Sequence, residues 1–287
     1  MAANTAEDRE RVSMTGDPRF AVRKNKIKAK LMAGEPAIAC WVYSVAPAVA
    51  SILGYIGFDA VIFDAEHAHY DSASIESMCR AADEGDTTPM LKLPSNHDAT
   101  LALRGVNAGI AGVHFADVET QGQAQAAVNL IKFYPYGKRG VAFTHRSGRY
   151  AMVHGSEYIE QVNAEMMAVI CIESIEGVDN LPEILKVPGV DVISVGPHDL
   201  SQSLGIPDQL EHPKLLEALD RVVGTCRDKG VPVGTGAWTK DMLEDRLARG
   251  FQYIHWPNDL RLMKERGMQV LDLYRSSLQA VSKDGAA

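Results

Sequence analysis

The sequence predicts a (β/α)8 barrel (TIM barrel), in which eight parallel strands alternate with helices and close into a ring. Eight short apolar runs rich in Val and Ile are typical of strands buried on both faces, and segments with helical spacing separate them. A length of 287 residues suits one such core. A doubly wound sheet is the alternative, but no GxGxxG motif follows an early strand.

The apolar runs give the strand order. The predicted strands are Ala37–Val42, Ala60–Phe63, Met90–Leu93, Gly112–Phe115, Ala168–Ile172, Val190–Val195, Val231–Gly234 and Tyr253–Trp256. Because each run is followed by a helical segment, consecutive strands are expected to be parallel neighbours.

The segments between the strands carry apolar residues on one helical face, as Ile75, Met78, Cys79 and Ala82 do. The predicted helices are Ser74–Ala82, Ala99–Asn107, Gln121–Phe133, Ser156–Met166, Val178–Leu185, Pro213–Lys229, Lys240–Arg249 and the amphipathic tail Leu260–Val281. Residues 1–24 are predicted to be a flexible N-terminal extension. Residues 25–287 then form a single barrel domain that includes an extended C-terminal helix.

Composition excludes several classes of protein. A net charge of −8 argues against binding to nucleic acid or an anionic membrane, but is compatible with a locally cationic site for a small acid. No apolar run approaches the ~20 residues of a membrane helix, and the charged N-terminus does not resemble a signal peptide. The four cysteines lack zinc-binding spacing and are expected to be reduced thiols. We therefore expect a cytoplasmic protein.

Polar residues follow the predicted strands at the points where the strands end. In a parallel barrel all these ends meet at one rim, so residues spread over 200 positions are expected to form one site. The candidates are Asp64, Glu66 and His67 after the second strand, Lys92 at the third, His114 in the fourth, Glu173 after the fifth, Gly196, Pro197, His198 and Asp199 after the sixth, and Trp238 after the seventh.

Glu173 and Asp199 follow adjacent strands and are candidate ligands of a hard divalent cation. Two carboxylates on one side of the ion would leave its other positions to water and substrate oxygens. The alternatives are a salt bridge for Glu173 and a helix N-cap for Asp199.

His67 is a candidate general base, a metal ligand or a helix cap, and either Asp64 or Glu66 is close enough in sequence to orient its imidazole. His114 lies within an apolar strand, where a satisfied core histidine is the alternative to a site residue. The connection 134–150 contains His145 and Arg146 and is either a cationic lid over an acidic substrate or a solvated loop.

Ordered motifs support a family resemblance. GFDAVIFDAEHAHYD at residues 57–71 resembles the GFDxxxxDxEHxxxD signature of the HpcH/HpaI class II aldolases. LPSNHD at 93–98 resembles the family's R-P-x-x-x-D, YPYGKRG at 134–140 its YPPxGxRG, IES at 172–174 its I-E-[ST], and GPHDLS at 196–201 its G-P-x-D-L-S. The resemblance covers nearly the whole chain, from about residue 28 to residue 278.

The resemblance implies a chemistry for these residues. Such aldolases make or break a carbon–carbon bond beside a 2-oxo acid, usually pyruvate, through an enolate stabilised by Mg, Mn or Co. By position, Glu173 and Asp199 match the metal ligands, His67 the base and Asp64 the residue that orients it, while Gly196 and Pro197 would lie near the oxo acid. Relatives form hexamers from dimers that exchange C-terminal helices, which suits the long tail.

One departure from the family pattern is prominent. The arginine of R-P-x-x-x-D, which stabilises the enolate, corresponds to Leu93, and Lys92 beside it is expected on the opposite strand face. Lys92, His114, His198 and Trp238 are therefore candidates for substrate contact. If the pocket still holds pyruvate in the family pose, Leu93→Arg is expected to raise aldolase activity.

These observations predict a metal-dependent carbon–carbon lyase with a non-standard substrate. A decarboxylase of 2-oxo acids or a carbon–carbon bond-forming synthase would use the same metal and enolate. A paralogue that binds a small acid without catalysis is the third alternative.

Overall fold

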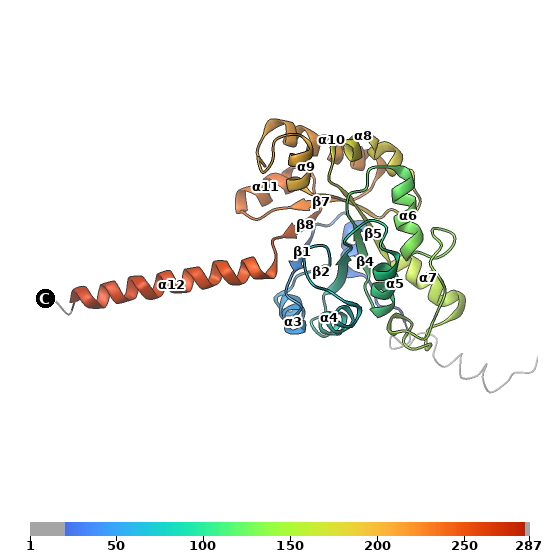
Figure 1. The fold of residues 1–287 in the computed structure, drawn as a ribbon, viewed down its shortest axis with the longest axis horizontal. Coiled ribbons are helices and arrows are strands. Elements are labelled where there is room, and N and C mark those ends of the chain that lie inside the picture. The colour runs from blue at the N-terminus through green and yellow to red at the C-terminus, as the bar shows by residue number, and fades with distance from the viewer. Residues whose placement is uncertain (1–20, 285–287) are drawn as a thin grey trace, which may run out of the picture.

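The computed structural model describes residues 21–284, and its centre is a closed eight-stranded parallel barrel (Figure 1). Each strand pairs with the next along the chain, and β1 pairs with β8 to close the ring, with Ala37 opposite Tyr253. The strands are β1 Ala37–Val42, β2 Ala60–Asp64, β3 Thr88–Lys92, β4 Gly112–Phe115, β5 Met167–Ile172, β6 Val192–Val195, β7 Val233–Gly236 and β8 Tyr253–Trp256. The predicted fold is confirmed.

Helices surround the barrel, and α2 packs at the end where the strands begin. They are α2 Lys26–Met32, α3 Pro47–Ile56, α4 Ser72–Glu84, α5 Ala99–Ala108, α6 Gln121–Ile131, the 3-10 turn η2 Arg146–Gly148, α7 Gly155–Glu165, α8 Ile175–Ile184, α9 Pro197–Ser203, α10 Pro213–Lys229, α11 Lys240–Arg249 and α12 Asp259–Asp284. α2, α3 and α9 were not among the helices that the spacing predicts. Ile27 and Leu31 of α2 join the interior apolar cluster and so close that end of the barrel.

Two strands differ from prediction in a way that matters for the site. β3 begins and ends before the predicted Met90–Leu93, because Thr88 already pairs with Ala60 and the strand ends at Lys92. β7 lies two residues later than the predicted Val231–Gly234, since its sequence VGTG lacks the apolar signature of a buried strand.

Alternation along the strands divides the apolar residues between two cores. Met90 belongs to the cluster inside the barrel, whereas Leu91 and Leu93 belong to the larger cluster between the strands and the helices. Inward residues near the carboxyl ends of the strands therefore face the barrel mouth, where the site lies.

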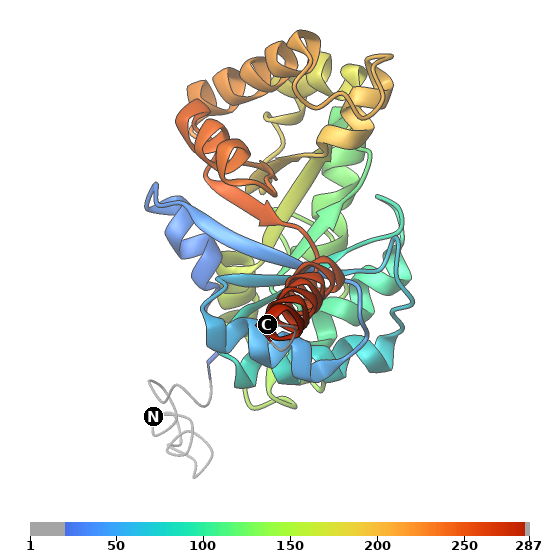
Figure 2. The same cartoon turned by 90° about the vertical axis from the view of Figure 1, so that its left-hand side faces the viewer.

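The two ends of the described chain behave differently. Residues 1–20 of the predicted extension lie outside the described residues, but the backbone N–H of Val22 donates to Gln161 and Lys24 pairs with Glu165, so the chain contacts the barrel from there on. α12 leaves the barrel after β8 and projects away from it, as Figure 1 shows from the side and Figure 2 along the helix. Within residues 21–284, no helix is both long enough and apolar enough to cross a membrane.

α3 and the end of α4 are in close contact, and substitution of a glycine at this contact tests how tightly the two helices pack. A Cβ on Gly54 of α3 would lie 2.3 Å from the backbone oxygen of Gly85, whereas a Cβ on Gly224 of α10 meets no atom within 4 Å. We expect Gly54→Ala to destabilise the protein by about 1–3 kcal/mol through overpacking. The matched control Gly224→Ala should stabilise it by ~0.5–1 kcal/mol. Chemical denaturation measures both, and equal effects would contradict the packing shown here.

Candidate active site at the barrel mouth

A cavity of about 520 Å³ lies at the carboxyl ends of the strands. It gathers side chains that are far apart in the sequence and come from the segments after β2, β4 and β5 and from α9. The lining residues are Glu66, His67, Asp117, Glu173, Ser174, Asp199, Gln202 and Ser203. The structure thus brings together four of the predicted residues, Glu66, His67, Glu173 and Asp199, around one cavity.

Lys92 is the cation beside this cavity. Its Nζ lies 2.6 Å from Glu66 Oε2 and 3.3 Å from Glu173 Oε1, and 5.7 Å from the centre of the Trp41 ring. Burial disfavours the ammonium, but the charges of Glu173, Cys171 and Glu66 outweigh it and hold the pKa of Lys92 above its ordinary value. Lys92 is therefore a protonated, largely buried cation.

The position of Lys92 corrects the interpretation of Leu93. Lys92 is the last residue of β3 and faces inward, opposite Asp64 on β2 and His114 on β4. Leu93 is fully buried in the outer apolar cluster, although its N–H still pairs with the His114 carbonyl at 3.1 Å. The residue that presents a charge to the mouth is therefore Lys92, because its pairing with Asp64 and His114 directs it inward and alternation directs Leu93 outward.

Asp64 and Glu66 have different roles around His67. Asp64 Oδ1 accepts the backbone N–H groups of Glu66 at 3.0 Å and His67 at 2.9 Å, so it shapes the turn after β2. Glu66 Oε2 lies 3.4 Å from His67 Nε2. Of the two acids considered for orienting the imidazole, Glu66 is the one in contact with it. Burial, followed by the charge of Asp64, raises the pKa of Tyr43 at this mouth to about 12.

Glu173 is held by the backbone around it. Its Oε2 accepts the N–H of Asp117 at 2.8 Å, and a Cβ on Gly196 would come within 2.8 Å of its Cγ and Oε1. Burial, opposed by Lys92 and the Asp117 N–H and reinforced by Asp199 and Glu66, raises the pKa of Glu173. Gly196 thus leaves room for the carboxylate, and Pro197 begins α9 beside it.

Asp117 is a site residue that sequence reasoning missed. It follows β4 by two residues, has a positive φ of 52°, and directs its N–H to Glu173. Left-handed backbone is uncommon outside glycine, and Asp tolerates it better than most residues. Burial and then the charges of Glu119, Asp199 and Glu66 raise the pKa of Asp117. The sequence could have indicated Asp117, because residues just after a strand of a parallel barrel lie at the same rim as the other candidates.

His198 and Trp238 lie together in a neighbouring recess of about 590 Å³. Their rings stack with centroids 5.1 Å apart and planes 12° from parallel, and His198 Nδ1 lies 3.0 Å from Asp208 Oδ1. Asp199, adjacent in sequence, lines the main cavity instead. The two predicted contact residues therefore form a separate part of the same rim.

His114 is a buried core histidine and does not line the cavity. It is fully buried inside the barrel, and its Nε2 lies 3.0 Å from the Tyr253 hydroxyl. Trp41 and His255 pack edge-on against it at 5.4 Å. Burial, then His255 and Lys92, lower its pKa well below the ordinary value, so it is neutral at neutral pH. Among the two alternatives for this residue, the structure favours the core histidine.

The connection between α6 and α7 lies at the opposite end of the barrel from the mouth. Arg146 donates to the Ala108 carbonyl at 2.8 Å, just after α5 ends, and pairs with Asp83 near the end of α4. His145 is the N-cap of η2 in the same connection. This segment is therefore not a lid over the mouth. Its Arg146 instead contacts the ends of α4 and α5.

The mouth has the donor chemistry of a hard-cation site but not a complete set of protein ligands. Carboxylates of Glu66, Asp117, Glu173 and Asp199 line one cavity, and like charges contribute to the raised pKa values of Asp117 and Glu173. Across residues 21–284, no three His, Cys, Asp or Glu side chains converge as ready metal ligands. A cation held here would need water or substrate oxygens as further ligands.

The family comparison matches most of the barrel. The model described as HpcH/HpaI aldolase/citrate lyase matches residues 37–265. A 2-dehydro-3,6-dideoxy-6-sulfogluconate aldolase from Pseudomonas putida is 30% identical over 234 residues, covering 82% of this chain and 91% of that protein. A 5-keto-4-deoxy-D-glucarate aldolase from Salmonella paratyphi A is 29% identical over 255 residues, covering 89% and 98%.

Solved structures agree with the fold. A family protein from Burkholderia cenocepacia superimposes with a TM-score of 0.83 at 30% identity, covering 88% of this chain and 100% of that one. Macrophomate synthase covers 96% of this chain and 98% of its own with a TM-score of 0.77, but at 21% identity this likeness concerns the fold alone.

The orientation of Leu93 reverses the expectation for Leu93→Arg. An arginine there would place an unpaired charge in the outer core, so we expect a loss of about 3 kcal/mol or more in the free energy of unfolding. Leu93→Met is the matched control and should lose less than ~1.5 kcal/mol because it conserves volume. Denaturant titration measures both. An arginine variant as stable as the methionine variant would show that Leu93 is not buried.

Proposed function

The chain belongs to the HpcH/HpaI aldolase/citrate lyase family, and we propose that it is a divalent-metal-dependent aldolase that cleaves a 4-hydroxy-2-oxo acid into a 2-oxo acid and an aldehyde. Its curated relatives are named as aldolases, which supports lyase chemistry. The metal, the substrate class and the residue roles below are parts of this proposal.

One series of contacts carries the proposal. His67 Nε2 lies 3.4 Å from Glu66, Glu66 lies 2.6 Å from Lys92, and Lys92 lies 3.3 Å from Glu173. A candidate base, a fixed cation and a candidate metal ligand are thus joined through shared carboxylates at one mouth. Aldol cleavage needs these three groups around one substrate.

Glu173 and Asp199 would hold the divalent metal, with Mg, Mn or Co as candidates. Both carboxylates line the cavity, and oxygen donors suit these hard cations. When bound, the ion would act as a Lewis acid toward the oxygens of the 2-oxo acid. Burial is the main cause of the raised pKa values of Glu173 and Asp117, and the like charges of Asp199 and Glu66 add to it, which supports a cation at the mouth.

His67 is the proposed base. In the cleavage direction it accepts the proton of the 4-hydroxyl group, directly or through one water, as the C3–C4 bond breaks. The electron pair of that bond passes into the 2-oxo group and forms the enolate of the oxo acid, while C4 becomes the aldehyde carbon. A proton then returns to C3. Glu66, whose Oε2 lies 3.4 Å from Nε2 of the ring, would orient the imidazole during this transfer.

Lys92 would stabilise the negative charge that develops on the 2-oxo oxygen. It is a cation in a largely buried setting, where such a charge has a stronger effect than in water. A buried lysine can also form a Schiff base with a ketone, but that requires the neutral amine and hence a lowered pKa. Because the pKa of Lys92 is raised, the electrostatic role is favoured.

Substrate contacts follow from the position of each candidate. Gly196 lies against Glu173 and Pro197 follows it as the first residue of α9, so we assign both to the oxo-acid end. His198 and Trp238 form the adjoining recess, which we assign to the aldehyde portion. The recess is an aromatic and polar surface at which substrate specificity would be set.

Two alternatives use the same mouth differently. A decarboxylase or a bond-forming synthase would need the metal and the enolate but not release of an aldehyde. A non-catalytic paralogue would bind a small acid and would not need His67. Products separate these cases: aldehyde with oxo acid, CO2 without aldehyde, or no turnover.

We further propose that α12 mediates self-association in a cytoplasmic homo-oligomer. Its exposed apolar residues are Leu260, Met263, Met268, Val270, Leu271, Leu273, Tyr274, Leu278 and Val281. A row of exposed apolar residues on a projecting helix is typical of a protein interface. The family resemblance suggests helix exchange between dimers within a hexamer.

The activity is tested with a panel of 4-hydroxy-2-oxo acids in the presence of Mg²⁺, Mn²⁺ or Co²⁺, with coupled detection of pyruvate and aldehyde. We expect metal-dependent release of both products, abolished by EDTA. His67→Ala should lower kcat by about 10²–10⁴-fold. His69→Ala is the matched control, because His69 is exposed in the same turn and is expected to leave kcat unchanged.

Several outcomes would contradict the proposal. CO2 without aldehyde would favour decarboxylation, and no turnover together with no change of thermal stability on adding metal would favour the non-catalytic paralogue. Inactivation by borohydride in the presence of pyruvate, lost in Lys92→Met, would indicate a Schiff base instead of a metal-stabilised enolate.

Gly196→Ala tests the assigned ligand without changing a charge. The added Cβ would lie 2.8 Å from Cγ and Oε1 of Glu173, so the carboxylate must move. We expect Mn²⁺ affinity to fall by about 10–100-fold, as for other changes that reorient a metal ligand. Titration calorimetry measures it, with Gly224→Ala as a remote control. Unchanged affinity in Gly196→Ala would remove Glu173 from the ligand set.

A further inference from the structure

A second cavity lies at the opposite end of the barrel, where β4 and β5 begin. Its volume is about 60 Å³, and Ala111 and Met166, which directly precede these strands, form part of its wall. Other wall residues come from the segment before α2 and from the connection between α6 and α7. It has no lining residue in common with the barrel mouth.

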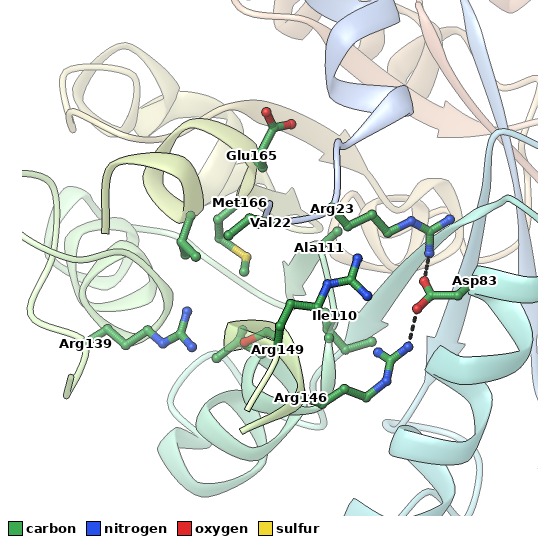
Figure 3. A pocket seen from close by; sticks show the side chains of 14 residues that line it. Val22, Arg23, Asp83, Ile110, Ala111, Arg139, Arg146, Arg149, Glu165 and Met166 are labelled. Carbon is green, nitrogen blue, oxygen red and sulfur yellow. Dashed lines mark hydrogen bonds and ion pairs between the residues drawn. The ribbon is translucent and has the colours of Figure 1, made fainter. Parts of the chain in front are cut away.

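Arginine dominates the charge of this cavity (Figure 3). The acidic wall residues are Asp83 and Glu165, and Glu165 is engaged by Lys24 at 2.6 Å and by the Asn25 N–H at 2.8 Å. The arginines in the wall are Arg23, Arg139, Arg146 and Arg149. Positive charge is therefore in excess around a small cavity of an acidic protein.

Two of the arginines share one acid. Arg23 and Arg146 both pair with Asp83, as the dashed lines in Figure 3 mark. Arg23 also donates to the Thr87 carbonyl at 2.8 Å and Arg146 to the Ala108 carbonyl at 2.8 Å. One carboxylate thus compensates two guanidinium groups, which leaves net positive charge on this side.

Arg139 supplies the decisive observation. It is buried, with 5% of its surface exposed, and its Nη2 donates to Asn107 Oδ1 at 2.9 Å while the guanidinium stacks 4.6 Å above Phe133. Its Nε and Nη1 are also buried, but neither has a hydrogen-bond acceptor within the described part of the chain. Buried charged donors are normally satisfied. The three N–H groups on these two nitrogen atoms therefore need an acceptor from outside the described part of the chain.

Arg149 completes the cavity from the solvent side. It is exposed, and Figure 3 shows its side chain between Arg139 and Arg23. Its backbone has a φ of 52°, and the next two residues, Tyr150 and Ala151, have φ values of 55° and 70°. Three consecutive left-handed non-glycine residues are costly, and this strained turn begins at the arginine that lines the cavity.

We propose that this cavity binds a small oxyanion, with the phosphate group as the chemistry that fits best. Arginine is the side chain suited to phosphate and carboxylate, because its planar donors pair with two oxygens at once. A cavity volume of about 60 Å³ is several times the roughly 10–15 Å³ that one water molecule needs by the same measure, so it suits one small anionic group and not a nucleotide. The site is independent of the proposed aldolase activity.

Inorganic phosphate is the probe. Thermal unfolding of the full chain is followed against phosphate at constant ionic strength set with NaCl, and calorimetry measures binding directly. EDTA is present so that no metal at the mouth can hold phosphate. At phosphate about 100-fold above its Kd, we expect Tm to rise by about 5 °C over the chloride control. Glycerol phosphate in a parallel titration distinguishes free phosphate from a phosphorylated metabolite.

Four variants locate the effect. Arg139→Gln and Arg149→Gln should each reduce the phosphate-dependent shift to about 1 °C or less. Arg149 is exposed, so its variant remains informative if Arg139→Gln fails to fold. Arg221→Gln is the matched control, since Arg221 is an exposed arginine on α10 paired with Asp179, remote from the cavity. Glu173→Gln should retain the full shift.

Three results would count against the site, and the comparison with glycerol phosphate identifies the form of the ligand. No shift beyond chloride would overturn it, as would an equal shift in Arg139→Gln and Arg149→Gln. Loss of the phosphate-dependent Tm shift in Glu173→Gln would indicate that phosphate binds at the mouth and not in the arginine cavity. Binding of glycerol phosphate as tight as that of phosphate would mean that the cavity is open enough for a metabolite, and weaker binding would favour the free ion.

Discussion

Strict alternation of side chains in a closed parallel barrel is the constraint on which the site depends. Because β3 ends at Lys92 with that side chain directed inward, the cation enters the mouth and Leu93 joins the outer core. The same parity directs Asp64 on β2 and His114 on β4 into the barrel beside it. A shift of β3 by one residue would exchange these faces and remove the cation from the mouth.

Negative charge is in excess at the mouth. Lys92 lies between Glu66 and Glu173, and the histidines beneath it add no positive charge at neutral pH. Burial, together with Lys92, lowers the pKa of His255 to about 3, and burial likewise keeps His114 neutral. Carboxylates at the rim are thus only partly compensated by the protein. This imbalance costs folding free energy, and a bound cation would recover it.

The sequence was sufficient to predict the barrel, the family and most of the rim, because strand exits and motifs are local patterns. It aligned the family's arginine with Leu93, whose side chain the structure buries in the outer core while Lys92 faces inward, because apolar runs do not show which strand face points into the barrel. It missed Asp117, which acts through its backbone N–H, and it could not place the connection with Arg146 at either end of the barrel. Such features depend on register and tertiary contacts that periodicity does not encode.

The mouth and the arginine cavity occupy opposite ends of the same two strands. β4 and β5 begin beside Ala111 and Met166 in the cavity wall, and the chain reaches Asp117 and Glu173 at the mouth just after they end. A ligand shifts activity only if it binds two arrangements of the protein differently. Strands paired on both sides in a closed barrel have no evident second arrangement. An oxyanion among the arginines is therefore expected to stabilise the start of β4 and β5 and to leave substrate affinity at the mouth unchanged.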